Sequence, residues 1–141
     1  MGMSSITTDM SVIEAGLQQF PADQSLLMVN LLRYRATADY AAGGDGAPCS
    51  GREAYYQRYA APTFDIIRRL GGRVFSFSHV QIPIFAPKGE NWDDVLLVEY
   101  PSFAALKDLV TDPGYQALVV HRMAALADTR VFATTRGTEI A

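Results

Sequence analysis

The order of strand-like and helix-like segments is the feature of this sequence that most limits its fold. Segments rich in β-branched, aliphatic and aromatic residues predict strands at residues 26–35, 73–85, 93–100 and 129–135. Helical patterns lie between the first two strands and between the last two. The order β-α-β-β-α-β predicts an α+β fold of the split βαβ, ferredoxin-like type. We expect a four-stranded antiparallel sheet with helices on one face.

Capping signals set the expected ends of the first crossover helix. The sequence from Ser50 to Glu53 reads as a capping box, in which a serine and a glutamate satisfy backbone groups at a helix start. The helix should run to about Leu70 and end at Gly71-Gly72, where a left-handed backbone is favourable only for glycine. Pro62 lies inside this pattern and predicts a kink, because its ring removes an N–H donor.

Similar signals set the ends of the second crossover. Ser102 is the expected N-cap of a helix over residues 103–110. Asp112-Pro113 then predicts a further helix to about Ala125, with the proline at the first helical position.

Two segments lie outside this core, which we place at about residues 26–137 of a single domain, 1–141. Residues 1–25 form an expected N-terminal helical extension, with a capping box at Ser11–Glu14 and a stop at Pro21. Residues 36–50 combine Ala, Gly, Asp and Pro without periodicity, which predicts a flexible loop.

Composition excludes several classes of protein. The 141 residues are 49% hydrophobic and 19% charged, with a net charge of −3, so disorder and nucleic-acid binding are not expected. No apolar run is long enough for a membrane span, and the first residues lack a signal peptide, which favours a cytoplasmic protein. The single cysteine, Cys49, agrees with a reducing compartment. With only two histidines, neither a metal site nor a cofactor is expected.

Aromatic residues on the predicted strands indicate a partner. By strand alternation, Phe75 and Phe77 should share a face with His79, and Phe132 should share one with Arg130. Both faces of the sheet would then carry aromatic side chains, although one helical layer covers only one of them. A second copy of the same sheet is the expected cover for the other face, which predicts a homodimer.

The second half of the chain resembles a known family. The runs Val98-Glu99-Tyr100-Pro101-Ser102-Phe103 and Asp112-Pro113-Gly114-Tyr115-Gln116-Ala117-Leu118, with Gly71-Gly72-Arg73 after a tyrosine-bearing helix, are similar to the domain-of-unknown-function 1330 family. That family belongs to the dimeric α+β barrel superfamily. The resemblance covers about residues 26–137 and implies a homodimer whose two sheets form a barrel, with a small-molecule cavity in each protomer. It implies no reaction, and the N-terminal helix and the 36–50 loop depart from the family pattern.

Polar residues within the predicted strands are the candidate site. Asn30 interrupts an apolar strand and is either a ligand anchor or a satisfied structural amide, and Tyr34 shares its face. Glu99 follows a buried run and is a candidate general base or one half of an ion pair. His79 is the candidate acid or base near neutral pH, the alternative being a hydrogen-bonded interface histidine. Arg130 could orient an anionic ligand.

These residues lead to two hypotheses about function. In the first, a homodimer binds a small carboxylate or carbonyl compound in the barrel, where His79 or Glu99 could support a cofactor-independent isomerase or oxygenase reaction. In the second, the protein is a non-catalytic ligand-binding or structural dimer in which each of these polar groups is merely satisfied.

Overall fold

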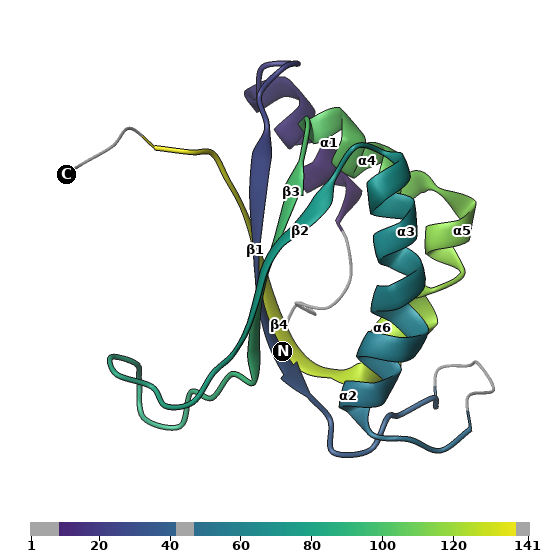
Figure 1. The fold of residues 1–141 in the computed structure, drawn as a ribbon, viewed down its shortest axis with the longest axis vertical. Coiled ribbons are helices and arrows are strands. Elements are labelled where there is room, and N and C mark those ends of the chain that lie inside the picture. The colour runs from purple at the N-terminus through teal and green to yellow at the C-terminus, as the bar shows by residue number, and fades with distance from the viewer. Residues whose placement is uncertain (1–8, 42–46, 138–141) are drawn as a thin grey trace.

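One antiparallel sheet with helices on a single face forms the computed structural model, which describes residues 9–41 and 47–137 (Figure 1). The strand order is β2-β3-β1-β4, so the expected ferredoxin-like topology is confirmed. The strands are β1 (Leu26–Tyr34), β2 (Arg73–His79), β3 (Asp94–Tyr100) and β4 (Leu126–Thr134).

Three groups of helices cover the sheet. They are α1 (Met10–Gln19), then α2 (Gly51–Glu53), the π-helix η1 (Ala54–Ala60) and α3 (Ala61–Arg69), and finally α4 (Phe103–Thr111), α5 (Pro113–Gln116) and α6 (Val119–Ala125). The predicted caps of α2 and α4 are confirmed. Ser50 Oγ accepts from the Glu53 N–H at 3.0 Å, and Ser102 Oγ accepts from the Ala105 N–H at 3.1 Å.

A π-helix directly precedes the segment that contains Pro62. The N–H of Ala61 donates to the carbonyl of Tyr56, five residues back, and Pro62 is the second residue of α3, which continues η1. The end of α3 follows the prediction, because Gly71 has φ +88° and the N–H of Gly72 donates to the carbonyl of Ile67 at 2.9 Å.

Several predicted boundaries are wrong for local reasons. The N-cap of α1 is Asp9, not Ser11, and its carboxylate accepts from the Ser11 N–H at 2.9 Å. The helix expected over residues 113–125 is interrupted at residues 117–118, between α5 and α6. The last strand begins at Leu126, and β2 ends at His79 rather than at residue 85. Within the expected loop 36–50, residues 42–46 lie outside the described part of the chain.

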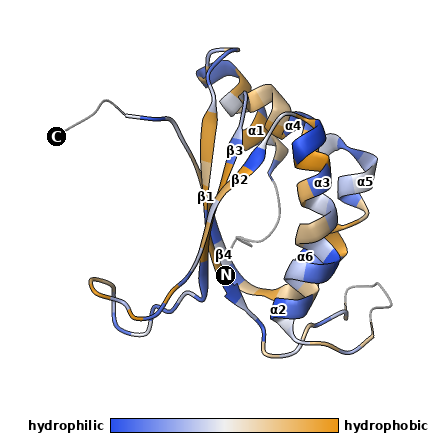
Figure 2. Ribbon diagram, in the orientation of Figure 1, coloured by the Kyte–Doolittle hydropathy of each residue, from blue (hydrophilic) through white to orange (hydrophobic). Residues whose placement is uncertain are grey.

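Residues 80–93, which we call the arm, connect β2 to β3 and project on the side of the sheet that the helices leave uncovered (Figure 1). The tip of the arm is coloured hydrophobic in Figure 2, and three large apolar side chains of the arm are exposed: Ile82, Ile84 and Phe85. The N–H of Val80 still donates to the Asp93 carbonyl at 2.9 Å, and beyond it Pro83 and Pro87 supply no N–H donors for further pairing.

The sheet has a helix-covered face and an open face. On the covered face, alternate residues of β3 are buried: Asp94, Leu96, Val98 and Tyr100. The open face carries Leu27, Val29 and Leu31 of β1 with Val95 and Leu97 of β3, which pair across the ladder and are half-buried. In the described residues, no helix is long and apolar enough to cross a membrane.

A bulge in β2 corrects one prediction about the sheet faces. The register with β3 shifts between Val74 and Ser76, so the simple alternation breaks at Phe75. Phe75 lies on the open face, under the guanidinium of Arg73, whereas Phe77 and His79 pair with Leu96 and Asp94 on the covered face. The expectation that Phe75 and Phe77 share a face with His79 is therefore wrong for Phe75.

Candidate functional site

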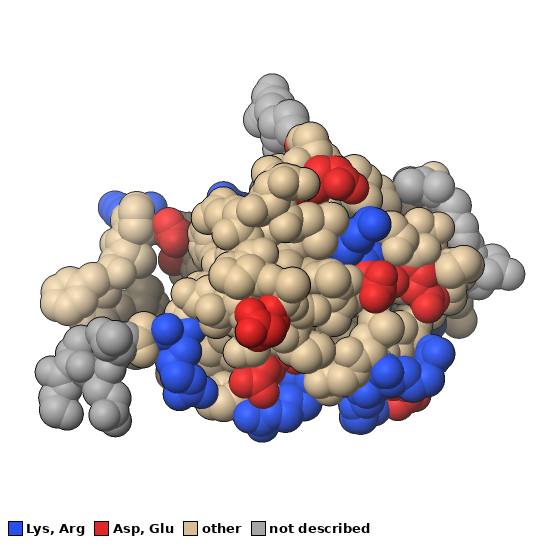
Figure 3. Space-filling view, turned by 90° about the horizontal axis from the view of Figure 1, so that it is seen from above, with Lys and Arg blue, Asp and Glu red and all other residues tan. Residues whose placement is uncertain are grey.

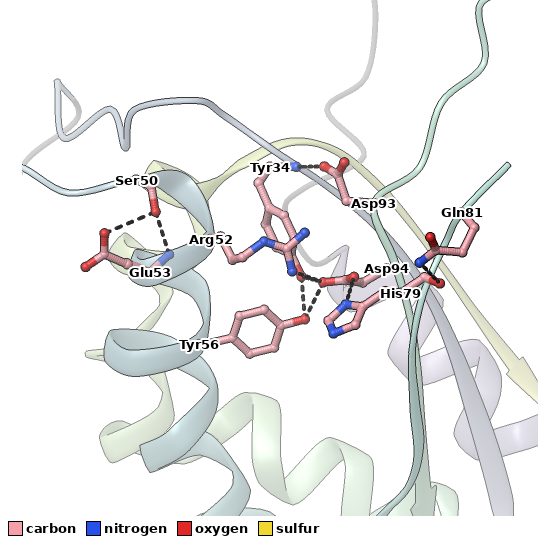
Figure 4. A network of polar contacts seen from close by, with 9 residues as sticks. All are labelled: Tyr34, Ser50, Arg52, Glu53, Tyr56, His79, Gln81, Asp93 and Asp94. Carbon is pink, nitrogen blue, oxygen red and sulfur yellow. Dashed lines mark hydrogen bonds and ion pairs between the residues drawn. The ribbon is translucent and has the colours of Figure 1, made fainter.

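A fully buried carboxylate, that of Asp94 at the start of β3, is the centre of a polar cluster (Figure 4). Its Oδ2 atom accepts hydrogen bonds from the Tyr34 hydroxyl at 2.5 Å and the Tyr56 hydroxyl at 2.6 Å. The Arg52 guanidinium donates to the same oxygen at 2.8 Å, and Nδ1 of His79 lies 2.7 Å from Oδ1. We call these five residues the Asp94 cluster.

The fold brings the Asp94 cluster together from five elements. In the sheet, Asp94 pairs with His79 of β2 on one side and with Leu32 of β1 on the other. Tyr34 ends β1, where a register shift against β4 follows Arg33. Arg52 comes from α2 and Tyr56 from η1, so the start of the crossover helix closes over the end of the sheet.

Burial and hydrogen bonding act in opposite directions on the Asp94 carboxyl. Burial raises its pKa, but the hydrogen bonds from Tyr34, Tyr56 and His79 and the charge of Arg52 outweigh burial, so its pKa is lowered. For the two phenols, burial and the neighbouring carboxylate together raise the pKa of Tyr34 and of Tyr56. The cluster is therefore an ionised carboxylate held by neutral phenols and a guanidinium.

His79 is the exposed member of the cluster. About 60% of its side chain is exposed, whereas the Asp94 side chain is completely buried. The ring of Phe77 packs edge-on between His79 and Tyr56, with centroids 5.1 Å from each. Because a carboxylate faces Nδ1, the neutral ring is held with its proton on that nitrogen, which leaves the lone pair on Nε2.

A cavity of about 610 Å³ lies elsewhere, between the sheet, α1 and the remaining helices. Its volume is in the usual range for small-molecule pockets, and its walls are mainly apolar. Helix α1 covers one side through Ile13 and Gly16, and the edge strand β4 contributes Val131 and Ala133.

Polar residues from both layers line the cavity, among them Asn30, Tyr55, Tyr59, Thr63, Tyr115 and Arg122. The hydroxyls of Tyr59 and Tyr115 lie 2.8 Å apart, and burial raises the pKa of Tyr59 while the charge of Arg122 opposes the shift. The Thr63 side chain is 2% exposed, and its hydroxyl is buried without a hydrogen-bond partner among the described residues.

The five residues predicted for the site do not converge. Asn30 lines the cavity, where its amide nitrogen donates to the carbonyls of Met28 and Leu96 at 3.3 and 3.1 Å. Tyr34 shares the covered face with Asn30, as predicted, but belongs with His79 to the Asp94 cluster.

Glu99 and Arg130 lie on the open face. Glu99 forms an ion pair with Arg73 at 2.8 Å, and 31% of its side chain is exposed. Of the two alternatives for Glu99, general base or half of an ion pair, its contacts in the structure are those of an ion pair. Arg130 pairs with Asp128 at 2.6 Å and lies over the ring of Trp92, at the rim of the cavity. His79, Glu99 and Asn30 therefore occupy three separate environments within one protomer.

Comparison with known proteins agrees with this fold. The model of the domain of unknown function DUF1330 matches residues 51–135. The chain belongs to the DUF1330 family. The match starts at α2 and leaves β1, with Asn30 and Tyr34, outside it, although the resemblance in the sequence was expected to begin at about residue 26. None of the curated proteins matches the chain.

Two crystal structures of RPA0582, a protein of unknown function from Rhodopseudomonas palustris, are similar to this DUF1330 chain over nearly its whole length. One is 29% identical with a TM-score of 0.84 and covers 97% of this chain and 100% of its own. The other, of the methylated protein, is 31% identical with a TM-score of 0.85 and covers 97% and 98%. The N-terminal helical extension therefore lies largely within the aligned span.

A third similar structure, from Bacteroides fragilis NCTC 9343, is of a protein described as dimeric, of unknown function and with a ferredoxin-like fold. It is 13% identical, with a TM-score of 0.44, and covers 82% of this chain and 100% of its own.

The run Asp112–Leu118, one of the segments similar to the family, contributes Tyr115 to the cavity lining. Asp112 caps α5 by accepting from the Tyr115 N–H at 3.1 Å, and this turn brings the Tyr115 hydroxyl to Tyr59.

Sequence reasoning missed Asp94, Arg52, Thr63 and Arg122. The burial of Asp94 could have been predicted from the sequence, because Asp94 alternates with the apolar Leu96 and Val98 along β3. In the described part of the chain, no group of His, Cys, Asp and Glu side chains could hold a metal ion.

Proposed function

We propose that this protein binds a small, mainly apolar carboxylate or carbonyl compound, as a cytoplasmic homodimer with one cavity per protomer. The buried, unpartnered hydroxyl of Thr63 carries the proposal. A hydroxyl shielded from water without a partner is costly, and a polar ligand atom in the cavity would remove that cost.

Other lining groups support an oxygen-bearing ligand. Arg122 brings a positive charge to the cavity lining. Burial raises the pKa of Tyr55 and of Tyr59, and the charge of Arg122 partly opposes this rise, so Arg122 lies close to both phenols. Asn30 uses its amide nitrogen for strand carbonyls, which leaves the amide oxygen as an acceptor. A carboxylate near Arg122 and Thr63, with an apolar remainder along Leu96, Val98 and Leu106, fits this distribution.

Ligand-induced stabilisation tests the binding proposal. Benzoate, phenylacetate and octanoate at millimolar concentration should raise the Tm, and benzyl alcohol and 1-octanol should raise it less. Thr63→Val and Arg122→Gln should each weaken octanoate binding at least threefold, while the exposed Arg68→Gln should bind as the original chain does. Binding of no carboxylate, or equal binding by Thr63→Val, Arg122→Gln and the original chain, would contradict the proposal.

The open face supports the homodimer. Phe75 and Phe132 are 44% and 55% exposed there and border the half-buried Leu27 and Val29. Ion pairs at its margin, Arg73–Glu99 and Arg33–Asp128, offer charges of both signs to a second copy. Figure 3 shows instead the end of the molecule at the top of Figure 1, where acidic and basic side chains both occur among uncharged ones.

Mass in solution tests the homodimer. Sedimentation equilibrium at micromolar concentration should give about twice 15.4 kDa. Phe132→Ser should move the chain toward monomer, whereas the exposed Val12→Ser, on α1, should not. A mass near 15.4 kDa for the original chain would contradict the homodimer.

A further inference from the structure

We propose that His79, positioned by Asp94, is a general base at a second site, one that takes a small anionic carbonyl compound with an acidic C–H bond. This site shares no residue with the cavity proposed above, so the two proposals stand or fall separately.

The histidine has the arrangement that a base requires. Asp94 Oδ1 lies 2.7 Å from Nδ1, which fixes the ring and its proton, and 60% of the side chain is exposed. Nε2 has no hydrogen-bond partner in the part of the chain that the structure describes. The strand that carries it, β2, is at the edge of the sheet, so no neighbouring strand lies on its outer side.

The carboxylate behind the ring is held in place by three donors. Two phenols and a guanidinium converge on Oδ2 of Asp94, so Oδ1 is aimed at the imidazole. These donors keep Asp94 from taking the imidazole proton for itself. It can therefore stabilise the imidazolium that forms when Nε2 accepts a proton.

Arg52 supplies a binding group beside the base. Its side chain is 46% exposed and lies over the Tyr34 ring at 4.7 Å. One N–H donates to Asp94, and within the described chain the other N–H groups of Arg52 have no partner. Arg52 and His79 contact the two different oxygens of the Asp94 carboxylate, so a substrate oxygen bound at Arg52 would bring its neighbouring carbon toward His79.

The supported step is keto–enol isomerisation. Nε2 of His79 takes the proton from the carbon next to the carbonyl, the C–H electron pair forms a C=C bond, and the carbonyl electron pair moves to oxygen as an enolate that Arg52 stabilises. The imidazolium then returns the proton to that oxygen, which gives the enol and restores neutral His79. The step consumes no oxidant, reductant or co-reactant.

Elimination of 5-nitrobenzisoxazole measures this basicity without knowledge of the natural substrate. A base removes the proton on its ring carbon, the C–H pair becomes part of a nitrile, and the N–O bond breaks to release a coloured nitrophenolate. Per site, the original chain should exceed free 4-methylimidazole at least about tenfold at pH 7, and His79→Gln should lose at least about nine-tenths of that rate, which brings it to about the level of free 4-methylimidazole. The matched variant His121→Gln, which changes a histidine bonded to Tyr40, should stay within twofold.

Pyruvate, a small anionic carbonyl compound, should inhibit this elimination in the original chain and inhibit it less in Arg52→Gln. The proposal would be overturned if the original chain were no faster than free 4-methylimidazole, or if His79→Gln kept the full rate. It would also be overturned if pyruvate did not inhibit, or inhibited Arg52→Gln equally. The positioning role of Asp94 has a readout that needs no variant. In ¹⁵N NMR of the original chain, neutral His79 should carry its proton on Nδ1, and a proton on Nε2 would exclude that role.

Discussion

His79 and Asp94 lie opposite one another in the antiparallel ladder of β2 and β3, so the register of the sheet itself places the imidazole against the carboxylate. The bulge at Phe75 determines this pairing, because without it every later side chain of β2 would point to the other face. A backbone irregularity four residues away thus decides whether the cluster forms.

Replacement of the buried carboxylate should destabilise the fold. Asp94→Asn keeps the volume but removes the charge that compensates Arg52, and its amide NH₂ cannot accept all the donors that now converge on the carboxylate. We expect a loss of about 3 kcal/mol in the free energy of unfolding, measured by urea denaturation. The exposed pair Asp65–Arg68 provides the control, since Asp65→Asn should change stability by less than about 0.5 kcal/mol. Equal effects of the two variants would contradict the cluster's structural role.

The contribution of Asp94 should disappear in acid. Its pKa is lowered in the folded chain, so its stabilisation is fully present above the ordinary carboxyl pKa, about 3.9, and is lost as the pH falls through the lower folded value. The difference in unfolding free energy between the original chain and Asp94→Asn should therefore shrink as the pH falls below about 4. A difference that grows below about pH 4 would mean that the carboxyl pKa is raised rather than lowered.

The sequence alone predicted the topology because strand and helix periodicities persist over whole segments, and serine, proline and glycine signals mark several of the breaks. The caps at Ser50 and Ser102 and the glycine end at Gly71 are of this kind. The placement of Tyr34 on the same face as Asn30 also followed, because β1 keeps strict alternation up to Arg33.

The site was less predictable because it depends on departures from regular geometry. The bulge at Phe75 adds one residue without a sequence mark, so the face of Phe75 was predicted wrongly. Tyr56 reaches Asp94 from a π-helix, whose wider turn changes which side chains share a face, and no 3.6-residue pattern finds it. Thr63 was invisible because a missing hydrogen bond is a property of packing, not of sequence.

Two buried threonines should respond to valine in opposite directions. Thr63→Val removes an unpartnered hydroxyl and should raise the free energy of unfolding of the unliganded protein by about 1 kcal/mol. Thr129→Val removes a donor to the Leu31 carbonyl at 2.8 Å and should lower it by about 1–2 kcal/mol. Urea denaturation of both variants in ligand-free buffer gives the comparison, and a loss of stability in Thr63→Val would show that its hydroxyl has a partner.

Alkaline titration should reveal the buried phenols. Burial raises the pKa of Tyr55 to about 12 and also raises the pKa of Tyr34, Tyr56, Tyr59 and Tyr100. A raised phenol pKa stabilises the fold fully below pH 10, and the contribution is lost as the pH rises above 10. Phenolate absorbance should therefore rise late and together with loss of the circular dichroism signal. Tyr55→Phe should remove one phenol from this late phase, and early ionisation of all seven tyrosines would contradict the burial.

A glycine contact fixes α1 over the cavity. A Cβ built on Gly16 would lie 2.0 Å from the end of the Phe103 ring, and Phe20 packs on the same ring at a centroid distance of 5.0 Å. Helix propensity alone predicts that Gly16→Ala stabilises α1 by about 1 kcal/mol. The clash is the larger effect, because Phe103 is 6% exposed and has little room to move, so we expect a net loss of about 1–2 kcal/mol. Exposed Gln18→Ala in the same helix should change stability by less than about 0.5 kcal/mol. Hydrogen exchange should be faster across α1 in Gly16→Ala only, and a stabilised Gly16→Ala would show that α1 does not rest on Phe103.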